Sequence, residues 1–384
     1  MRKDISKEEI RRYIVKHGKD MRTAEIARKL KIADSLVRYH RIQLGVHFVE
    51  KKYVPEETPL SEQVYALMKK RRNAHTIASL SDALDVGVSK VKTAIEALRA
   101  QGKNIRFIQG GIELSSEIPK TEDTRIDVKK LQGKTVRFGL TSDNHLASKY
   151  ARMDVLNALY DIWSAQGIDT VYQCGNMIDG EARFNKFELI AVGVEGQADF
   201  FAKHWPVRKG ITTKFITGDD HEGWYIQREG INIGKYLEDT ALAHGRKDLV
   251  YLGHMEHDII FTGTKQKSVL RLIHAGGGSS YATSYAPQKI VESYQGGEKP
   301  NVLLVGHYHK AEYGYPREVH VVQAGCTSDQ SSFMRKNKLQ AHVGGWTIEF
   351  TLTPEGFITR FKCEWIPFYD KGFYEKAWKQ QFLK

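Results

Sequence analysis

Histidine, aspartate and asparagine recur in five short polar segments of this chain, and these residue types can bind metal ions. In chain order the segments are Asp143-Asn144-His145, Gly175–Asp179, Gly218–Glu222, His274 and Gly306–His309. Imidazole, carboxylate and amide groups suit Mn²⁺, Fe²⁺ or Zn²⁺. Two such ions about 3.5–4 Å apart could clamp a phosphoryl group and activate a water for in-line attack. The segments therefore predict a centre for two divalent metals.

Each segment lies at the end of a run that is typical of a buried strand. The runs are residues 136–140, 170–172, 214–216, 269–273 and 302–305. An apolar, β-prone run bounded by glycine favours a strand that is covered on both faces. In α/β proteins, sites form where the ends of such strands meet. We therefore expect the five segments to converge at one edge of a sheet.

The order of the segments resembles the calcineurin-like metallophosphoesterase superfamily from Thr135 onward. That family's pattern is D-x-H, G-D-x-x-D, G-N-H-D/E, a lone His and G-H-x-H. Asp143 and His145 match the first motif, His274 matches the lone His, and Gly306–His309 match the last. The order also resembles the nuclease domain of Mre11/SbcD-type repair proteins. The resemblance implies an α/β fold, a four-layer α/β/β/α sandwich of two mixed sheets.

The two middle motifs depart from the family pattern. Asn176 stands where the family has a metal-bridging Asp, and Asp219-Asp220-His221 stand where it has Asn-His, with one residue extra. The exchanges look reciprocal, because an Asp became Asn in one motif and an Asn became Asp in the other. The charge around the metals would then be conserved. Either Asp219 or Asp220 could supply the ligand, and we favour Asp220.

The resemblance also implies a role for each residue. Two divalent ions are expected, with Mn²⁺ favoured and Fe²⁺ or Zn²⁺ as alternatives. Asn176 would bridge the ions, His221 would protonate the leaving oxygen as a general acid, and Asn144 would touch the phosphate. Asp179 would orient a ligand or a loop. The ligands of one ion would be Asp143, His145 and His309, and those of the other would be Asp220, His274 and His307.

Composition limits the class of protein. A chain of 384 residues, 41% of them hydrophobic, is long enough for two or three globular domains. We find no apolar run of the roughly 18 residues that a membrane span needs, and no apolar segment typical of a secretory signal at the N-terminus. The three cysteines, Cys174, Cys326 and Cys363, are dispersed. We therefore expect a cytoplasmic protein with no disulfide framework and no membrane partner.

The net charge is concentrated in the first third of the chain. Residues 1–120 carry 25 Lys or Arg and 15 Asp or Glu, which gives +10 of the total of +12. The rest of the chain is nearly neutral. A basic module joined to a neutral one suggests a polyanion as partner, although a solvated basic face would have the same composition.

Residues 1–50 have the pattern of a helix-turn-helix. Helices are predicted over residues 6–16, 23–32 and 35–45, the first starting with a capping box of Ser6 and Glu9. Gly45 would end the last helix. That helix would present side chains to a major groove of DNA. They are Ser35, Arg38, Tyr39 and Arg41. Small helical hairpins also bind proteins, so a protein partner is the alternative.

Residues 58–115 have the pattern of a winged helix. Helices are predicted over residues 60–72, 76–84 and 89–100, followed by a two-stranded hairpin over residues 105–114. The basic residues of this unit would contact DNA phosphates, which set affinity more than sequence choice. They are Lys90, Lys92, Arg99 and Arg106. Winged helices also dock proteins, which is again the alternative.

The remainder is expected to be a polar linker over residues 116–134 and a metallophosphoesterase domain over residues 135–384. A helix is predicted over residues 153–166, between the first two strands. Near the C-terminus, strands over residues 319–325, 345–351 and 357–361 would together form the second sheet. The basic loop over residues 327–340 could lie at the site or be a solvated loop.

Three hypotheses for the function follow. The leading one is a metal-dependent hydrolase of phosphodiesters, a DNA nuclease that carries its own DNA-binding modules. The second keeps the enzyme but changes the substrate, to a phosphomonoester or a cyclic nucleotide. The third is a DNA-binding protein whose phosphoesterase domain is impaired because Asn176 replaces the bridging Asp.

Overall fold

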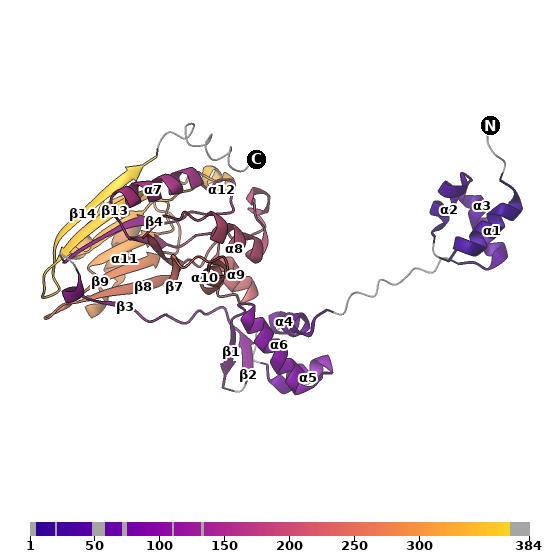
Figure 1. The fold of residues 1–384 in the computed structure, drawn as a ribbon, viewed down its shortest axis with the longest axis horizontal. Coiled ribbons are helices and arrows are strands. Elements are labelled where there is room, and N and C mark those ends of the chain that lie inside the picture. Colours follow the sequence, from indigo (N-terminus) through magenta and orange to yellow (C-terminus); the bar gives the residue numbers. More distant parts are fainter. Residues whose placement is uncertain are drawn as a thin grey trace. The chain divides into compact units, whose positions relative to one another are not determined.

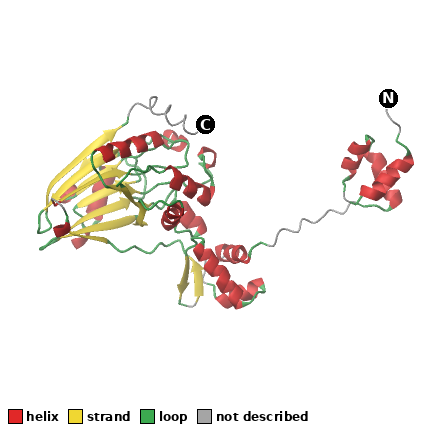
Figure 2. Cartoon of the chain, in the orientation of Figure 1, coloured by secondary structure: helices red, strands yellow, loops and turns green. Residues whose placement is uncertain are grey.

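The computed structural model describes residues 5–19, 21–47, 58–70, 75–109, 111–131 and 134–368. The chain forms two compact units, Met1–Pro59 and Leu60–Lys384. The described part of the first unit is helical, and the second unit combines helices and strands (Figure 2). Residues 48–50 and 369–384, at the ends of two expected domains, lie outside the described residues. Among the described helices, none has the length and apolar character needed to cross a bilayer.

The first unit contains three helices. They are α1 (Lys7–His17), α2 (Thr23–Leu30) and α3 (Asp34–Leu44). The expected capping box is present, because the Ser6 side chain accepts from the Glu9 N–H and the Glu9 carboxylate accepts from Ser6. Gly45 ends α3 with a left-handed φ of 61°. The core of the unit consists of Ile10, Ile14, Ile26, Ala27 and Val37.

The second unit begins with three helices and an antiparallel hairpin, the elements expected there. They are α4 (Leu60–Lys70), α5 (Ile77–Leu84), α6 (Val88–Ala100), β1 (Ile105–Ile108) and β2 (Gly111–Leu114). Their shared core includes Val64, Leu80 and Ile95. This part packs on the rest of the unit near Glu229, whose carbonyl accepts from the Tyr65 hydroxyl at 3.0 Å and whose carboxylate pairs with Lys103 at 3.6 Å.

Two six-stranded mixed sheets form the rest of the second unit (Figure 1). The first sheet has the order β14-β13-β4-β5-β6-β7. Its strands are β4 (Thr135–Thr141), β5 (Thr170–Cys174), β6 (Thr212–Thr217), β7 (Leu249–His254), β13 (Gly344–Leu352) and β14 (Ile358–Pro367). Strands β4 to β7 are parallel, and β13 joins β4 antiparallel.

The second sheet has the order β11-β12-β10-β9-β8-β3. Its strands are β3 (Thr124–Asp127), β8 (Glu256–Thr262), β9 (Lys267–His274), β10 (Val302–Gly306), β11 (Ala311–Gly314) and β12 (His320–Ala324). Strands β9, β10 and β12 are parallel. The prediction that the three C-terminal strand runs form one sheet is wrong, because β12 lies here whereas β13 and β14 extend the first sheet.

The two sheets pack face to face, and helices cover their outer faces. Along β6, Ile216 points into the core between the sheets and Phe215 into the core under the helices. Leu304 and Leu303 alternate in the same way on β10. Helices α7 (Met153–Ala165), α8 (Gly193–His204), α9 (Gly223–Glu229) and α10 (Ile233–Ala243) pack on the first sheet, and α11 (Tyr285–Ser293) packs on the second. A short helix, α12 (Ser332–Lys336), follows β12. The four-layer α/β/β/α sandwich is confirmed.

The interpretation of residues 116–134 as a linker is wrong for its second half. Strand β3 pairs in parallel with β8 at the edge of the second sheet, and Val128 is fully buried in the core between the sheets. The polar composition hid this strand, since an edge strand with one exposed face needs few apolar residues. Residues 124–131 therefore belong to the sandwich.

Candidate metal centre

The five polar segments meet where the two sheets come closest. Three of them follow β4, β5 and β6 of the first sheet, and two follow β9 and β10 of the second. Gly306 permits this approach, because a Cβ at that position would collide with the Cys174 carbonyl. The expectation of a single sheet edge is therefore wrong. The site lies across adjacent edges of two sheets, and each sheet contributes ligands.

One cluster contains Asp143, His145 and His309, whose candidate ligand atoms lie within 4.8 Å of one another. The Nε2 atoms of the two imidazoles face each other at 3.1 Å, and Asp143 Oδ1 lies 3.5 Å from His309 Nε2. Two ring nitrogens so close must share a proton or a cation. The other carboxylate oxygen of Asp143 accepts from the Ser142 hydroxyl at 2.6 Å and from the backbone N–H of His307 at 2.9 Å.

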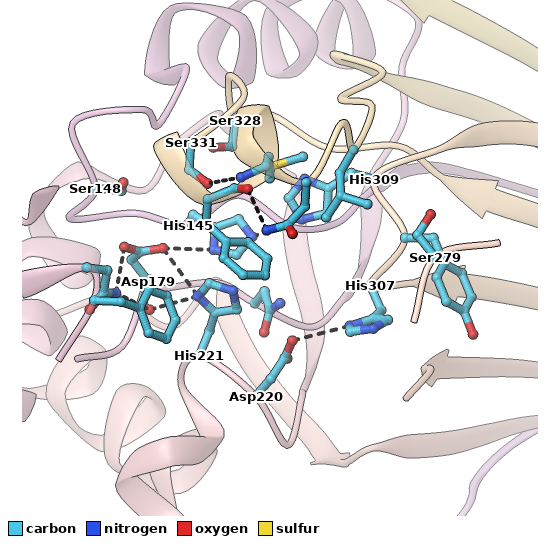
Figure 3. A pocket seen from close by; sticks show the side chains of 18 of the residues that line it. His145, Ser148, Asp179, Asp220, His221, Ser279, His307, His309, Ser328 and Ser331 are labelled. Carbon is cyan, nitrogen blue, oxygen red and sulfur yellow. Dashed lines mark hydrogen bonds and ion pairs between the residues drawn. The ribbon is translucent and has the colours of Figure 1, made fainter. Parts of the chain in front are cut away.

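A second cluster contains Asp220, His274 and His307. The two Asp220 oxygens lie 3.1 Å from His274 Nε2 and 3.2 Å from His307 Nδ1. Figure 3 shows Asp220 directed at His307, apart from the group around His145. Asp219 is exposed and belongs to neither cluster. Of the two aspartates left open by the sequence, Asp220 is the one beside the histidines.

In three of the imidazoles, the ring nitrogen that faces away from the cluster lies beside an oxygen acceptor. This contact fixes the orientation of the ring and directs the other nitrogen at the cluster. His145 Nδ1 lies 3.0 Å from Asp179 Oδ1, His274 Nδ1 lies 2.7 Å from the Cys174 carbonyl, and His307 Nε2 lies 2.7 Å from the Gly277 carbonyl. Each acceptor takes one ring N–H, so the opposite nitrogen is directed at the cluster and can bind a metal when it carries no proton. Metal-binding histidines are oriented in this way.

Asn176 lies between the two clusters. Its Nδ2 donates to Asp143 Oδ1 at 3.2 Å. Its Oδ1 is buried, and no described residue donates a hydrogen bond to it. A Cβ on Gly218 would lie 3.0 Å from this oxygen and against the His274 ring, so Oδ1 lies on the side of the second cluster. An unsatisfied buried acceptor is costly and calls for a cation or donor. The amide therefore fits a bridging position.

Three imidazoles of the two clusters differ in the direction in which their pKa values are shifted. Burial lowers the pKa of His309 to about 3 although Asp143 opposes this shift. For His274, burial acts against the charged ring, but Asp220 and Asp143 outweigh it and raise the pKa to about 9. The pKa of His307 is also raised, since Asp220 again outweighs burial. Carboxylates that hold protons on imidazoles favour any cation at the same place.

His221 lies beside the first cluster. Its Nδ1 is 3.0 Å from the Asp179 carbonyl and 3.3 Å from Asp179 Oδ1, and its ring stacks on Trp224 at 4.7 Å. Figure 3 shows Asp179 linked to both His145 and His221. Burial disfavours a charged ring, but Asp179 and Asp220 raise the pKa of His221 to about 9. The side chain therefore holds a proton at neutral pH.

The sequence interpretation gave no role to Glu222, which is fully buried. Its carboxylate accepts the backbone N–H groups of Asn176, Gly218 and Met177 at 2.7–2.9 Å and that of Ile178 at 3.3 Å. Burial raises the pKa of Glu222 to about 7 against these donors. Glu222 thus ties the bridging loop to the loop before Asp220. Its place as the acidic last residue of the third motif was the available signal.

Asn144 does not reach the cavity, which corrects its predicted contact with phosphate. The residue is fully buried, and its Nδ2 donates to the hydroxyls of Thr141 and Thr327 at 2.8 and 2.9 Å. Its Oδ1 accepts from Gln173 at 2.9 Å. All its polar atoms are occupied, so Asn144 positions the loop that carries Asp143 and His145.

The backbone of the site is strained at several non-glycine residues. Left-handed φ angles between 45° and 89° occur at Asp143, His145, Asn176, His221, His307 and His309. Such a conformation is uncommon for residues with a Cβ, and it concentrates at functional sites. The sharp turns after the strands direct these side chains inward instead of along the sheets.

Both clusters open into a cavity of about 450 Å³. His145, Asn176, Asp220, His221, His307 and His309 contribute to its wall. The segment over residues 327–340, expected either at the site or in solvent, also lines the cavity. It does so through residues such as Ser331, Phe333 and Asn337, whereas its basic side chains are not part of the lining.

Three of the four DNA-contact candidates on α3 are exposed, namely Ser35, Arg38 and Tyr39. Arg41 is buried at 7% exposure, and its guanidinium donates to the Met21 carbonyl. The predicted DNA contact of Arg41 is therefore corrected. Arg41 follows the buried Val37 by one helical turn and shares its inward face.

On the hairpin unit, Lys90, Lys92 and Arg99 are exposed along α6. Arg106 is different, because its guanidinium lies 2.7 Å from the Glu117 carboxylate and 3.2 Å from the Ser115 hydroxyl. This pairing corrects the expectation that Arg106 is free for phosphate. The side chain instead joins the hairpin to the segment that leads to β3.

No protein-family model and no curated protein matches the sequence. The chain is similar to a solved archaeal phosphodiesterase at 12% identity, over 60% of this chain and all of that one, with a TM-score of 0.33. It is similar to Vps29 with zinc from Entamoeba histolytica at 12% identity, over 61% and 100% of the chains, with a TM-score of 0.28. A putative 5'-nucleotidase from Staphylococcus aureus shows 12% identity, coverage of 64% and 58%, and a TM-score of 0.36.

Proposed function

We propose that the protein is a two-metal phosphodiesterase of the calcineurin-like type that cleaves DNA, with its N-terminal modules binding the duplex. The observation that carries the proposal is the pair of three-ligand clusters with Asn176 between them. Its buried, unpartnered oxygen and the facing imidazole nitrogens of His145 and His309 are arrangements that divalent cations satisfy. The donor set of imidazole, carboxylate and amide suits Mn²⁺, Fe²⁺ or Zn²⁺.

Asp143, His145 and His309 would hold one ion, and Asp220, His274 and His307 the other, with Asn176 between them. Two bound ions supply Lewis-acid polarisation of the phosphoryl oxygens and a nucleophilic water. The oxygen of this water would bond to phosphorus and lose its proton to solvent while the bond from phosphorus to the leaving oxygen breaks. His221 gives its proton to that oxygen, because Asp179 holds Nδ1 and leaves Nε2 as the acid. Without metal, the pKa of His221 is raised to about 9, chiefly by Asp179, so the metal-free side chain holds the proton that it would donate.

DNA is proposed as the substrate because of the charge of the attached modules. The first 120 residues carry +10, and exposed basic side chains line α3 and α6. Arg38, Lys90, Lys92 and Arg99 are the candidate phosphate contacts after the exclusion of Arg41 and Arg106. Binding through phosphates would weaken steeply as salt rises.

The test combines metal content with turnover of bis(p-nitrophenyl) phosphate and of linear and plasmid DNA, with Mn²⁺ supplied. Wild type should bind two ions per chain and cleave both substrates, and His221→Ala should lose most of the activity on DNA while keeping its metals. Equal activity of wild type and His221→Ala on DNA would contradict the proposal. A preference for p-nitrophenyl phosphate without nucleolysis would identify a phosphomonoesterase instead.

One observation favours a second candidate, a DNA-binding protein with an impaired site. Asn176 is neutral and donates its N–H to Asp143, whereas a carboxylate at this position could bind both ions through charge. The same assay with Asn176→Asp separates the candidates. A wild type that binds at most one ion and is inert, together with an active Asn176→Asp, would favour the impaired site.

A further inference from the structure

Three aromatic side chains stand at the rim of the metal centre. Phe184 follows β5 in a loop, Trp224 lies in α9 and Phe333 lies in α12. Phe184 is 5.4 Å from Trp224 and 5.9 Å from Phe333 between ring centroids. All three line the cavity that contains Asp220 and His221. Three segments far apart in the sequence thus form one aromatic wall, defined here as Phe184, Trp224 and Phe333.

The aromatic wall is not part of a core. Phe184 and Phe333 are 60% and 53% exposed, and neither belongs to any of the hydrophobic clusters among the described residues. A single exposed phenylalanine is ordinary, but several that converge on a cavity mark a binding surface. The exposed surfaces of Phe184 and Phe333 are available to a flat, apolar group.

We propose that the aromatic wall binds a nucleobase of the phosphoester substrate, on the leaving-group side of the scissile bond. This inference rests on the proposed phosphodiesterase function. Trp224 stacks on His221, the proposed acid, at 4.7 Å and an interplanar angle of 29°. A nucleoside whose oxygen takes the proton from His221 therefore has its base next to Trp224. Bases stack on aromatic side chains without regard to sequence.

The other groups around the aromatic wall suit a base better than a second phosphate. Asn337 and Gln340 line the same cavity, and amides can pair with the hydrogen-bonding edges of a base. The basic residues of the same segment, Arg335, Lys336 and Lys338, do not line it. The wall therefore offers stacking and neutral hydrogen bonding next to the charged metal centre.

The test compares a thymidine dinucleotide with two analogues, each lacking one of the two bases. For wild type with Mn²⁺, removal of the leaving-side base should lower kcat/KM about tenfold, since stacking on an aromatic residue is worth about 1–3 kcal/mol per base. Removal of the other base should have a smaller effect. In Phe184→Leu and Phe333→Leu the tenfold preference should shrink, and Phe333→Tyr should retain it because the ring remains.

Phe187→Leu is the matched control, because Phe187 is 92% exposed and does not line the cavity. It should keep the full preference for the base. Equal losses on the dinucleotide and on both analogues in Phe333→Leu would mean a general structural effect and would overturn the proposal. So would a wild type that cleaves the dinucleotide and both analogues equally well.

A binding measurement separates this inference from the proposed function. Calorimetry compares thymidine 5'-phosphate with deoxyribose 5-phosphate on wild type and Phe333→Leu. The base should tighten binding about tenfold in wild type only. If wild type cleaves no diester but keeps this difference, the proposed function fails and the base site stands. If cleavage occurs without any preference for the base in turnover or in binding, the base site fails and the function stands.

Discussion

The two candidate metal clusters contain the same ligand types, one aspartate and two histidines each, yet they differ in charge behaviour. Asp143 is fully buried, and its outer oxygen is satisfied by Ser142 and by a backbone N–H. The Asp220 side chain is 29% exposed, and both of its oxygens face imidazoles at 3.1 and 3.2 Å. Burial lowers the pKa of His309 in the first cluster to about 3, whereas Asp220 raises the pKa of His274 in the second.

The difference shows that burial and carboxylate contacts together decide which cluster holds protons. At His309, burial outweighs the attraction of Asp143, and the imidazole stays neutral and ready for a cation. Where the carboxylate has only imidazoles as partners, as at Asp220, it binds protons through them. We therefore expect the first cluster to take up a metal over a wide pH range and the second to exchange protons for its metal.

The largest expected effect comes from removal of the Asp220 charge. Asp220→Asn should lower metal content from two ions to one and reduce turnover of bis(p-nitrophenyl) phosphate about a thousandfold, because one ion contributes several kcal/mol to the transition state. Metal analysis and initial rates measure both. Asp219→Asn is the matched control, since Asp219 is exposed and outside both clusters. Equal losses in the two variants would remove the distinction between these aspartates.

A smaller effect is expected from pH, and it should separate the clusters directly. His274 has a pKa of about 9 without metal, so below that pH a proton must leave before the second ion binds. Affinity for that ion should fall at least tenfold per pH unit below about 9, because the pKa of His307 in the same cluster is raised as well. The first ion should depend less on pH, because the pKa of His309 is about 3. Manganese titrations at pH 6, 7 and 8 measure the affinities for both ions. The same pH dependence for the two ions would contradict the proposed difference between the clusters.

The sequence predicted the members of both clusters because each ligand follows a strand, and strand ends are local features. The sequence did not predict which strand belongs to which sheet. Runs such as residues 269–273 and 136–140 have similar apolar patterns because both are covered on two faces, although they lie in different sheets. The capping box at Ser6 and the helix end at Gly45 were predictable for the same local reason.

Contacts between distant residues were beyond the sequence. Asn144 is held by Thr327, which lies 183 residues further along the chain, and only the fold reveals that its amide is occupied. The ion pair between Arg106 and Glu117, which joins the hairpin to the segment that follows it, was likewise not evident from the sequence. Arg41 is different, because its spacing of four from Val37 was visible in the sequence, yet the prediction placed it in a DNA groove. A basic residue one helical turn from a buried apolar residue can therefore lie on the buried face of its helix.

The smallest expected effect comes from Glu222→Gln. This variant tests whether the Glu222 carboxylate holds together the loops that carry the two clusters. The carboxylate accepts four backbone N–H groups, three from the loop around Asn176 and one from Gly218. Glu222→Gln replaces one oxygen with an N–H₂ group that cannot accept, and each oxygen accepts two of these groups, so two buried N–H groups lose their partner. We expect the free energy of unfolding of the metal-free protein to fall by about 2 kcal/mol.

Urea unfolding followed by tryptophan fluorescence measures this change chiefly in the sandwich, because five of the six tryptophans lie in its described residues. They are Trp163, Trp205, Trp224, Trp346 and Trp365. Glu238→Gln is the matched control, since Glu238 accepts a single backbone N–H, from Tyr251 at 3.0 Å. An unfolding free energy of Glu222→Gln within about 0.5 kcal/mol of wild type would mean that the loops hold without the carboxylate. If the free energy of unfolding of Glu222→Gln does fall, both ions should also bind more weakly to this variant, because Glu222 orders the segment that lies between the clusters.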